Sequence, residues 1–198
     1  ESAPVAGNEE FIALAGDMVK QLATGPGAAT AAELLGQPSP GKSGKTLKDQ
    51  FDELYNRIRE NFQFERLVRI DAPCGGYAHH NGAVGVLLEV EGGTPDLAKD
   101  ICMHIAAMKP TVLSVKDLDP NAVAKEREIL AEAARQEGKP ENIIDKMVEG
   151  RMRNYYSTFC LEDQVFVKAE DGKSTVAQVA KKAGMKIKQF LHWELAKE

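Results

Sequence analysis

The chain has 198 residues, of which 43% are hydrophobic and 28% are charged, a composition typical of a globular protein and not of a disordered or collagen-like one. The chain has 25 Lys and Arg residues and 30 Asp and Glu residues, which gives a net charge of -5. This charge disfavours a nucleic-acid-binding protein whose whole surface neutralises phosphates. Three widely spaced cysteines without a CxxC pair predict reduced thiols in the cytoplasm and no zinc site. No apolar stretch approaches the ~18 residues of a membrane-spanning helix, and we expect no signal peptide in the residues that follow Glu1.

The first predicted elements are three helices, each opened by a capping residue. Asn8 precedes Glu9 and Glu10 and a run with 3.6-residue apolar spacing that ends at Gly25. Thr30 and Thr46 each precede an acidic residue by three positions, which is the pattern of a capping box. From residue 62 to 70 apolar and polar residues alternate, which predicts a half-buried strand.

A β-hairpin is predicted next, with strands over 77–80 and 83–90. Asn81-Gly82 lies between them, a dipeptide suited to the positive φ angles of a type I′ turn. Thr94-Pro95 opens a helix that closes at Lys109-Pro110, and residues 111–115 are predicted as a short strand.

Two further helices, over 120–138 and 140–159, are joined by Gly138-Lys139-Pro140 and predict an αα-hairpin. A helix over 174–182 and a strand over 187–195 end the chain.

The chain repeats itself weakly. Residues 14–23 are similar to 97–106, and 45–70 are similar to 174–193, although amphipathic segments also match by chance. The mixture of helices and antiparallel hairpins predicts an α+β fold of two related helix/strand subdomains with an inserted αα-hairpin at about 120–160. The predicted halves are residues 1–73 and 74–198.

One segment matches a nucleotide-binding pattern. Residues 36–43 fit GxxxxGK[ST], in which Lys42 and Ser43 would serve phosphate and Mg²⁺ in an NTPase. That mechanism needs a strand before the loop and a helix directly after it, whereas a helical segment precedes this one. Pro38 and Pro40 also remove two N–H donors, so a surface loop is the favoured interpretation.

The histidines and cysteines form no recognisable metal or catalytic frame. His79 and His80 are adjacent and diverge on a strand, and Cys102 and His104 diverge on a helix. His104 lies at the edge of an apolar helix stripe, where it is either a core histidine or a polar group in a surface groove. No metal, cofactor or catalytic residue is predicted.

Five sequence blocks follow one another in an order that is typical of one family. The blocks are residues 80–90 (HNGAVGVLLEV), 103–107 (MHIAA), 125–130 (KEREIL), 138–143 (GKPENI) and 146–151 (KMVEGR). Together they resemble bacterial elongation factor Ts, and the similarity extends from Glu1 almost to Glu198.

The resemblance implies a cytoplasmic guanine-nucleotide exchange factor, not an enzyme, that promotes GDP release from elongation factor Tu by disturbing its Mg²⁺ site. The partner is expected in its GDP-bound and nucleotide-free forms, without membrane or direct nucleic-acid binding. The family usually carries an N-terminal ubiquitin-associated-like module, so the chain resembles a core fragment. Two alternatives are a scaffold that binds elongation factor Tu with weak exchange, and the P-loop NTPase.

The resemblance also implies where the partner binds. Ser2, Ala3, Pro4 and Val5 occupy the place of the family's Thr-Asp-Phe-Val, whose Phe is a wedge in the partner, and they lack its carboxylate and its ring. The other expected partner-binding residues are at the hairpin tip and on the helix that follows, namely Gly82, Ala83, Val84, Gly85, His104 and Met108. Ala83-Val84 stands where Arg-Ile is common in the family.

Overall fold

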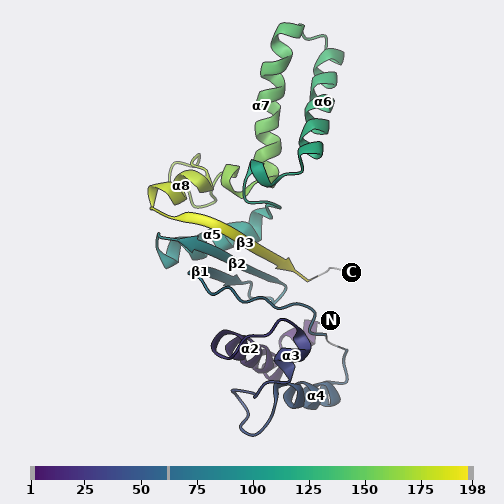
Figure 1. Cartoon of the computed structure of the whole chain (residues 1–198). Helices are drawn as coiled ribbons and strands as arrows, with labels where there is room; N and C mark the ends of the chain where they lie inside the picture. The colour runs from purple at the N-terminus through teal and green to yellow at the C-terminus, as the bar shows by residue number, and fades with distance from the viewer. Residues whose placement is uncertain (1–2, 62, 196–198) are drawn as a thin grey trace. The chain divides into compact units, whose positions relative to one another are not determined.

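The computed structural model describes residues 3–61 and 63–195, which divide into one unit over Glu1–Asp71 and a second over Ala72–Glu198. The helices and strands are shown in Figure 1.

The first unit is helical in its described residues. Its elements are α1 (Ala3–Ala6), α2 (Glu9–Thr24), α3 (Ala31–Leu35) and α4 (Leu47–Ile58). The predicted caps are confirmed: the Asn8 side chain accepts hydrogen bonds from the first turn of α2, and Thr30 and Thr46 each form a capping box. The core of the unit centres on Leu14 and Leu54, with Phe11, Met18, Phe51 and Ile58 packed around them.

The strand predicted over 62–70 is not formed by the described residues 63–70, and residue 62 lies outside the description. A strand needs a neighbour for its backbone N–H and C=O groups, and the described part of this unit contains no other strand. The segment is instead tied to the end of α2 by the Arg69 guanidinium, which donates to the carbonyl oxygens of Leu22 and Gly25.

The second unit is built on an antiparallel sheet in the order β1-β2-β3, made of β1 (Cys74–Ala78), β2 (Val84–Glu91) and β3 (Lys186–Glu194). Helix α5 (Pro95–Met108) packs on one face. Every second residue of β2 points toward this face: Val86, Leu88 and Val90 are buried, while their neighbours are exposed or half-buried. These three side chains share one core with Ala98, Ile101, Cys102 and Ile105 of α5 and with residues of the C-terminal segment. The mixture of helices with this antiparallel sheet confirms an α+β fold.

Two local predictions in this unit are wrong. The turn at Asn81-Gly82 is not type I′, because only Gly82 has a positive φ, of 73°, and Asn81 does not. The Gly82 N–H bonds to the His79 carbonyl oxygen, so the hairpin has a longer loop in which one residue is left-handed. The strand predicted over 111–115 is reduced to a single bridge between Val112 and Cys160, followed by the 3₁₀ helix η1 (Val115–Asp117).

Helices α6 (Pro120–Gln136) and α7 (Glu141–Phe159) run side by side (Figure 1). Their core is separate from that of the sheet and contains Ala134, Ile144, Val148 and Met152. The 3₁₀ helix η2 (Leu161–Asp163) follows α7, and α8 (Val176–Lys182) then leads into β3.

A close approach of α5 to β1 makes one glycine necessary. A Cβ added to Gly75 would lie 2.8 Å from the Cβ and 2.9 Å from the backbone carbon of Ala98, whereas a Cβ on Gly76 would lie 3.7 Å from the Leu87 side chain and 4.0 Å from the Val86 carbonyl oxygen. We therefore expect Gly75→Ala to lower the free energy of unfolding by roughly 1–3 kcal/mol, because α5 must move away from the sheet. Gly76→Ala is the matched control and should change it by less than about 1 kcal/mol. Urea denaturation measures both, and equal effects would show that the approach of α5 is not tight.

Candidate functional site

The hairpin tip between β1 and β2 is held by hydrogen bonds of its own residues. The His79 N–H donates to the Val84 carbonyl oxygen at 2.9 Å, and the Asn81 side-chain oxygen accepts from the Ala83 N–H at 2.9 Å. Asn81 therefore organises the tip by an Asx-type bond rather than by adopting a positive φ. Of the predicted partner-binding residues here, Gly82 and Gly85 are exposed, and Ala83 and Val84 are half-buried.

The structure brings this tip together with the C-terminal end of α5. Val84 pairs with Glu194 in the sheet, and the Glu194 carboxylate accepts from Lys109 Nζ at 2.7 Å. Lys109 is the C-cap of α5, in a left-handed conformation with φ 49°. Met108, directly before it, has 46% of its surface exposed. Val84 and Met108 are thus predicted site residues at the same end of the sheet.

His104 lies one helical turn before Met108 but is completely buried. Its Nε2 lies 2.9 Å from Gln164 Oε1, and its Nδ1 accepts from the Val167 N–H at 3.3 Å. The Phe166 ring is 5.7 Å away between centroids. In this conformation the imidazole reaches no solvent, which is the core placement that the sequence left open.

These contacts fix the protonation state of His104. A backbone N–H can only donate, so Nδ1 must be unprotonated, and Nε2 then carries the hydrogen that Gln164 accepts. Burial lowers the pKa of His104, and the hydrogen bond to Gln164 acts in the opposite direction. The native state therefore favours the neutral imidazole.

The remaining predicted partner-binding segment lies in the first unit. Ser2 is outside the described residues, and Ala3 and Pro4 belong to the backbone of α1. Val5 is buried, and its carbonyl oxygen accepts from the N–H of Asn8 at 3.0 Å, which joins α1 to the cap of α2.

The segment that fits the P-loop pattern, residues 36–43, does not have the structure of a phosphate-binding loop. It follows helix α3, and its Ser39 hydroxyl is buried and donates to Gln50 of α4 at 2.7 Å. Lys42, which would contact phosphate, pairs with Glu53 at 3.4 Å. The segment is anchored on α4, an arrangement that does not support the NTPase alternative.

Two of the three cysteines, Cys102 and Cys160, are buried, and Cys74 is exposed. Burial raises the pKa of Cys102 to about 12 and, with nearby carboxylates, that of Cys160 to about 11, and it also raises the pKa of Cys74. Within residues 3–61 and 63–195, no three His, Cys, Asp or Glu side chains are grouped so that they could hold a metal ion. In the same part of the chain, no helix combines the length and apolar character needed to cross a membrane.

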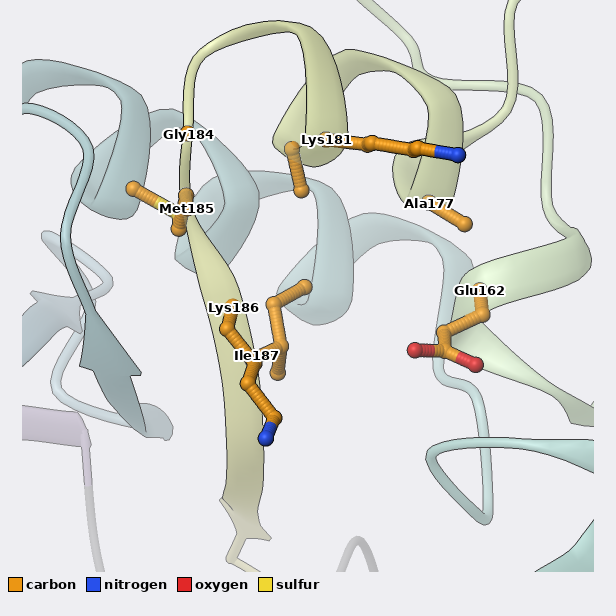
Figure 2. A pocket seen from close by; sticks show the side chains of 8 residues that line it. Glu162, Ala177, Lys181, Gly184, Met185, Lys186 and Ile187 are labelled. Atoms are coloured by element: carbon orange, nitrogen blue, oxygen red, sulfur yellow. The ribbon is translucent and has the colours of Figure 1, made fainter.

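A groove of about 500 Å³ between α8 and the start of β3 was not predicted from the sequence (Figure 2). Ala177, Ala180, Met185 and Ile187 provide apolar lining, and Lys181, Lys186 and Glu162 bring charges to it. Burial, together with Asp163 and Asp117, raises the pKa of Glu162.

Comparison with known proteins gives a consistent result. A family model described as "Elongation factor TS" matches residues 4–197. Two proteins named elongation factor Ts, from Clostridium botulinum strains Alaska E43 and Eklund 17B, are each 37% identical to the chain over 202 and 204 residues. Both alignments cover 96% of this chain and 66% of the relative. The elongation factor Ts of Alkalilimnicola ehrlichii is 40% identical over 155 residues, which are 77% of this chain and 52% of the relative. The chain thus spans slightly less than two thirds of the relatives it matches over most of its length.

The buried neutral His104 predicts a pH dependence of stability. On acidification the unfolded chain binds a proton at this histidine before the native chain does, so native stability falls as the pH drops below the unfolded pKa of ~6.5 and levels off below the native pKa. Urea denaturation between pH 8 and pH 5 should show this loss for the wild type and less of it for His104→Gln. His80→Gln, at the exposed hairpin loop, is the control and should keep the wild-type slope. Parallel wild-type and His104→Gln profiles would exclude this role of His104.

Proposed function

The chain belongs to the elongation factor Ts family, and from this premise we propose that it is a guanine-nucleotide exchange factor for elongation factor Tu in translation elongation. The observation that carries the proposal is the family match over residues 4–197, which includes the candidate contact residues from Pro4 onward. We expect the protein to act in the cytoplasm, without catalytic chemistry or a cofactor of its own.

Exchange of this kind needs only a difference between two affinities. If the protein binds nucleotide-free elongation factor Tu more tightly than the GDP-bound form, reciprocity weakens GDP binding by the same factor. Each tenfold difference corresponds to about 1.4 kcal/mol. Equal affinity for both forms would hold the partner without moving nucleotide.

We propose three contact regions for the partner. The first is the segment Ser2, Ala3, Pro4 and Val5, the second is the hairpin tip over 82–85, and the third is α5 with His104 and Met108. The proximity of the tip to the exposed Met108 supports the second and third as one surface. Val84 and Met108 offer apolar area there, and His104 contributes from beneath the surface.

Disturbance of the partner's Mg²⁺ site is assigned to the segment over 2–5. This chain has Ala3-Pro4 where the family has Asp-Phe, so we expect slower exchange than the family pattern provides. The alternative within this proposal is a scaffold that binds elongation factor Tu with weak exchange.

We also infer that α6 and α7 form a helical hairpin and that the two units are related. The side-by-side packing of α6 and α7 around their own core supports the first inference. The similar apolar pattern of α2 and α5 supports the second.

The function is tested by the release of fluorescent GDP from elongation factor Tu of the same source. The wild-type chain at saturation should accelerate release, and Met108→Glu should lower its affinity for nucleotide-free elongation factor Tu about tenfold, because the change places an unpaired charge in an apolar contact. Val19→Glu is the matched control, since Val19 is a helical apolar residue with 67% of its surface exposed. Tight binding with an unchanged release rate would establish the scaffold instead.

The replacement of the family's Asp-Phe by Ala3-Pro4 leads to a separate prediction. The double change Ala3→Asp and Pro4→Phe should accelerate GDP release severalfold at saturating protein, because it restores the carboxylate and the aromatic ring of the family pattern. Ala6→Asp is the control, since it adds the same charge at an exposed position of α1 without a ring. An unchanged rate for the double variant would mean that other contacts determine the rate.

A further inference from the structure

His104 belongs to a chain of hydrogen bonds that joins three segments of the second unit. From His104 on α5 the chain continues to Gln164, whose Nε2 donates to the carbonyl oxygen of Thr158 at 3.2 Å. Thr158 lies in the last turn of α7, and the other ring nitrogen of His104 holds the backbone of Val167. His104 and Gln164 are both almost completely buried, with exposed fractions of 0% and 2%.

The donors and acceptors along these hydrogen bonds match in one arrangement only. The Val167 N–H requires an acceptor at Nδ1, the N–H at Nε2 requires the oxygen of the Gln164 amide, and the Gln164 NH₂ group is then left for the Thr158 carbonyl. A second proton on the imidazole would face the Val167 N–H, donor against donor. Protonation of His104 therefore breaks the contact to Val167.

The elements packed around His104 also carry charged residues. Asp100, one turn earlier on α5, pairs with Lys168 of the segment after Val167 at 2.7 Å. The acidic residues of η2, Glu162 and Asp163, precede Gln164 in the chain. The pKa of His104 is lowered by burial, and the only opposing contribution comes from Gln164.

These hydrogen bonds lie at the base of the α6–α7 pair, where they can hold the pair against α5. The α6–α7 pair has its own core, and it joins the sheet layer through residues 111–114 on one side and 158–164 on the other. Gln164 links the second of these connections to α5, one turn before the exposed Met108. We infer that His104 is a positioning residue, which as a neutral imidazole fixes the base of the α6–α7 pair against α5, the helix that carries Met108 of the proposed contact surface. The functional part of this inference rests on the proposed function, whereas the structural part does not.

The structural part is tested by pulsed electron paramagnetic resonance distances in the full chain. Cys74 is the exposed cysteine, so Cys74→Ser removes it while Cys102 and Cys160 stay buried. Spin labels at Lys99→Cys on α5 and Arg153→Cys on α7, both exposed positions, measure the distance across the base. A second pair, Glu128→Cys with Arg153→Cys, measures the distance within the α6–α7 pair.

At pH 8 the distance across the base should have one narrow distribution in the wild type and should broaden or shift in His104→Ala and Gln164→Ala. His104→Gln keeps one donor and one acceptor without a titrating proton, so it should retain the narrow distribution. The distance within the α6–α7 pair should stay unchanged throughout. Gln50→Ala is the control for loss of a buried hydrogen bond elsewhere, since Gln50 bonds Ser39 in the first unit, and it should leave both distances unchanged.

Acidification provides a measurement that needs no destabilising variant. On acidification to the pH at which the native chain protonates His104, the wild-type distribution should broaden reversibly while circular dichroism stays native, and that of His104→Gln should not. Affinity for nucleotide-free elongation factor Tu should fall about tenfold in His104→Ala and be restored in His104→Gln. An unchanged distribution in His104→Ala at pH 8, or the same broadening in His104→Gln, would overturn the inference. If the wild type does not accelerate GDP release, the proposed function fails while the distances still decide the structural part.

Discussion

The second unit depends on the packing of one helix against one face of a three-stranded sheet. The strict alternation of β2 buries Val86, Leu88 and Val90, and α5 covers them with Ala98, Ile101 and Ile105. Gly75 allows β1 to approach the helix backbone at Ala98. Because the hairpin tip and the end of α5 are both fixed by this packing, the apolar contact also determines the spacing of the surface residues Val84 and Met108.

Hydrogen bonds between polar groups in this apolar layer fix the orientation of one element against another, which hydrophobic contact alone does not. Burial of aliphatic side chains is not directional, so it tolerates small rotations of one element against another. The bonds of His104 to Gln164 and Val167 are directional and lie where three segments meet. The ion pairs on the surface, such as Lys168 with Asp100, are partly exposed and contribute little to the same task.

Local signals in the sequence predicted most of the fold. Capping residues such as Asn8 and Thr46 placed the helices, because these side chains bond to neighbours two or three residues away. The strand over 62–70 was predicted wrongly, since its alternation reports a preference and not the presence of a pairing partner. The contact of His104 with Gln164 spans 60 residues, so no periodicity could reveal it, and the groove near Glu162 likewise combines distant segments. The P-loop pattern is not sufficient for a related reason, because its chemistry depends on the elements around it.

The separate core of the α6–α7 pair has a consequence for which insertions and deletions the fold tolerates. Two short connections at its base join it to the sheet layer, and the buried residues of its core lie in these two helices. Whole helical turns, of about 5.4 Å each, can therefore be added or removed at the far end without repacking the sheet. The length of α6 and α7 can therefore change by insertion or deletion while the sheet and the helices packed on it stay the same.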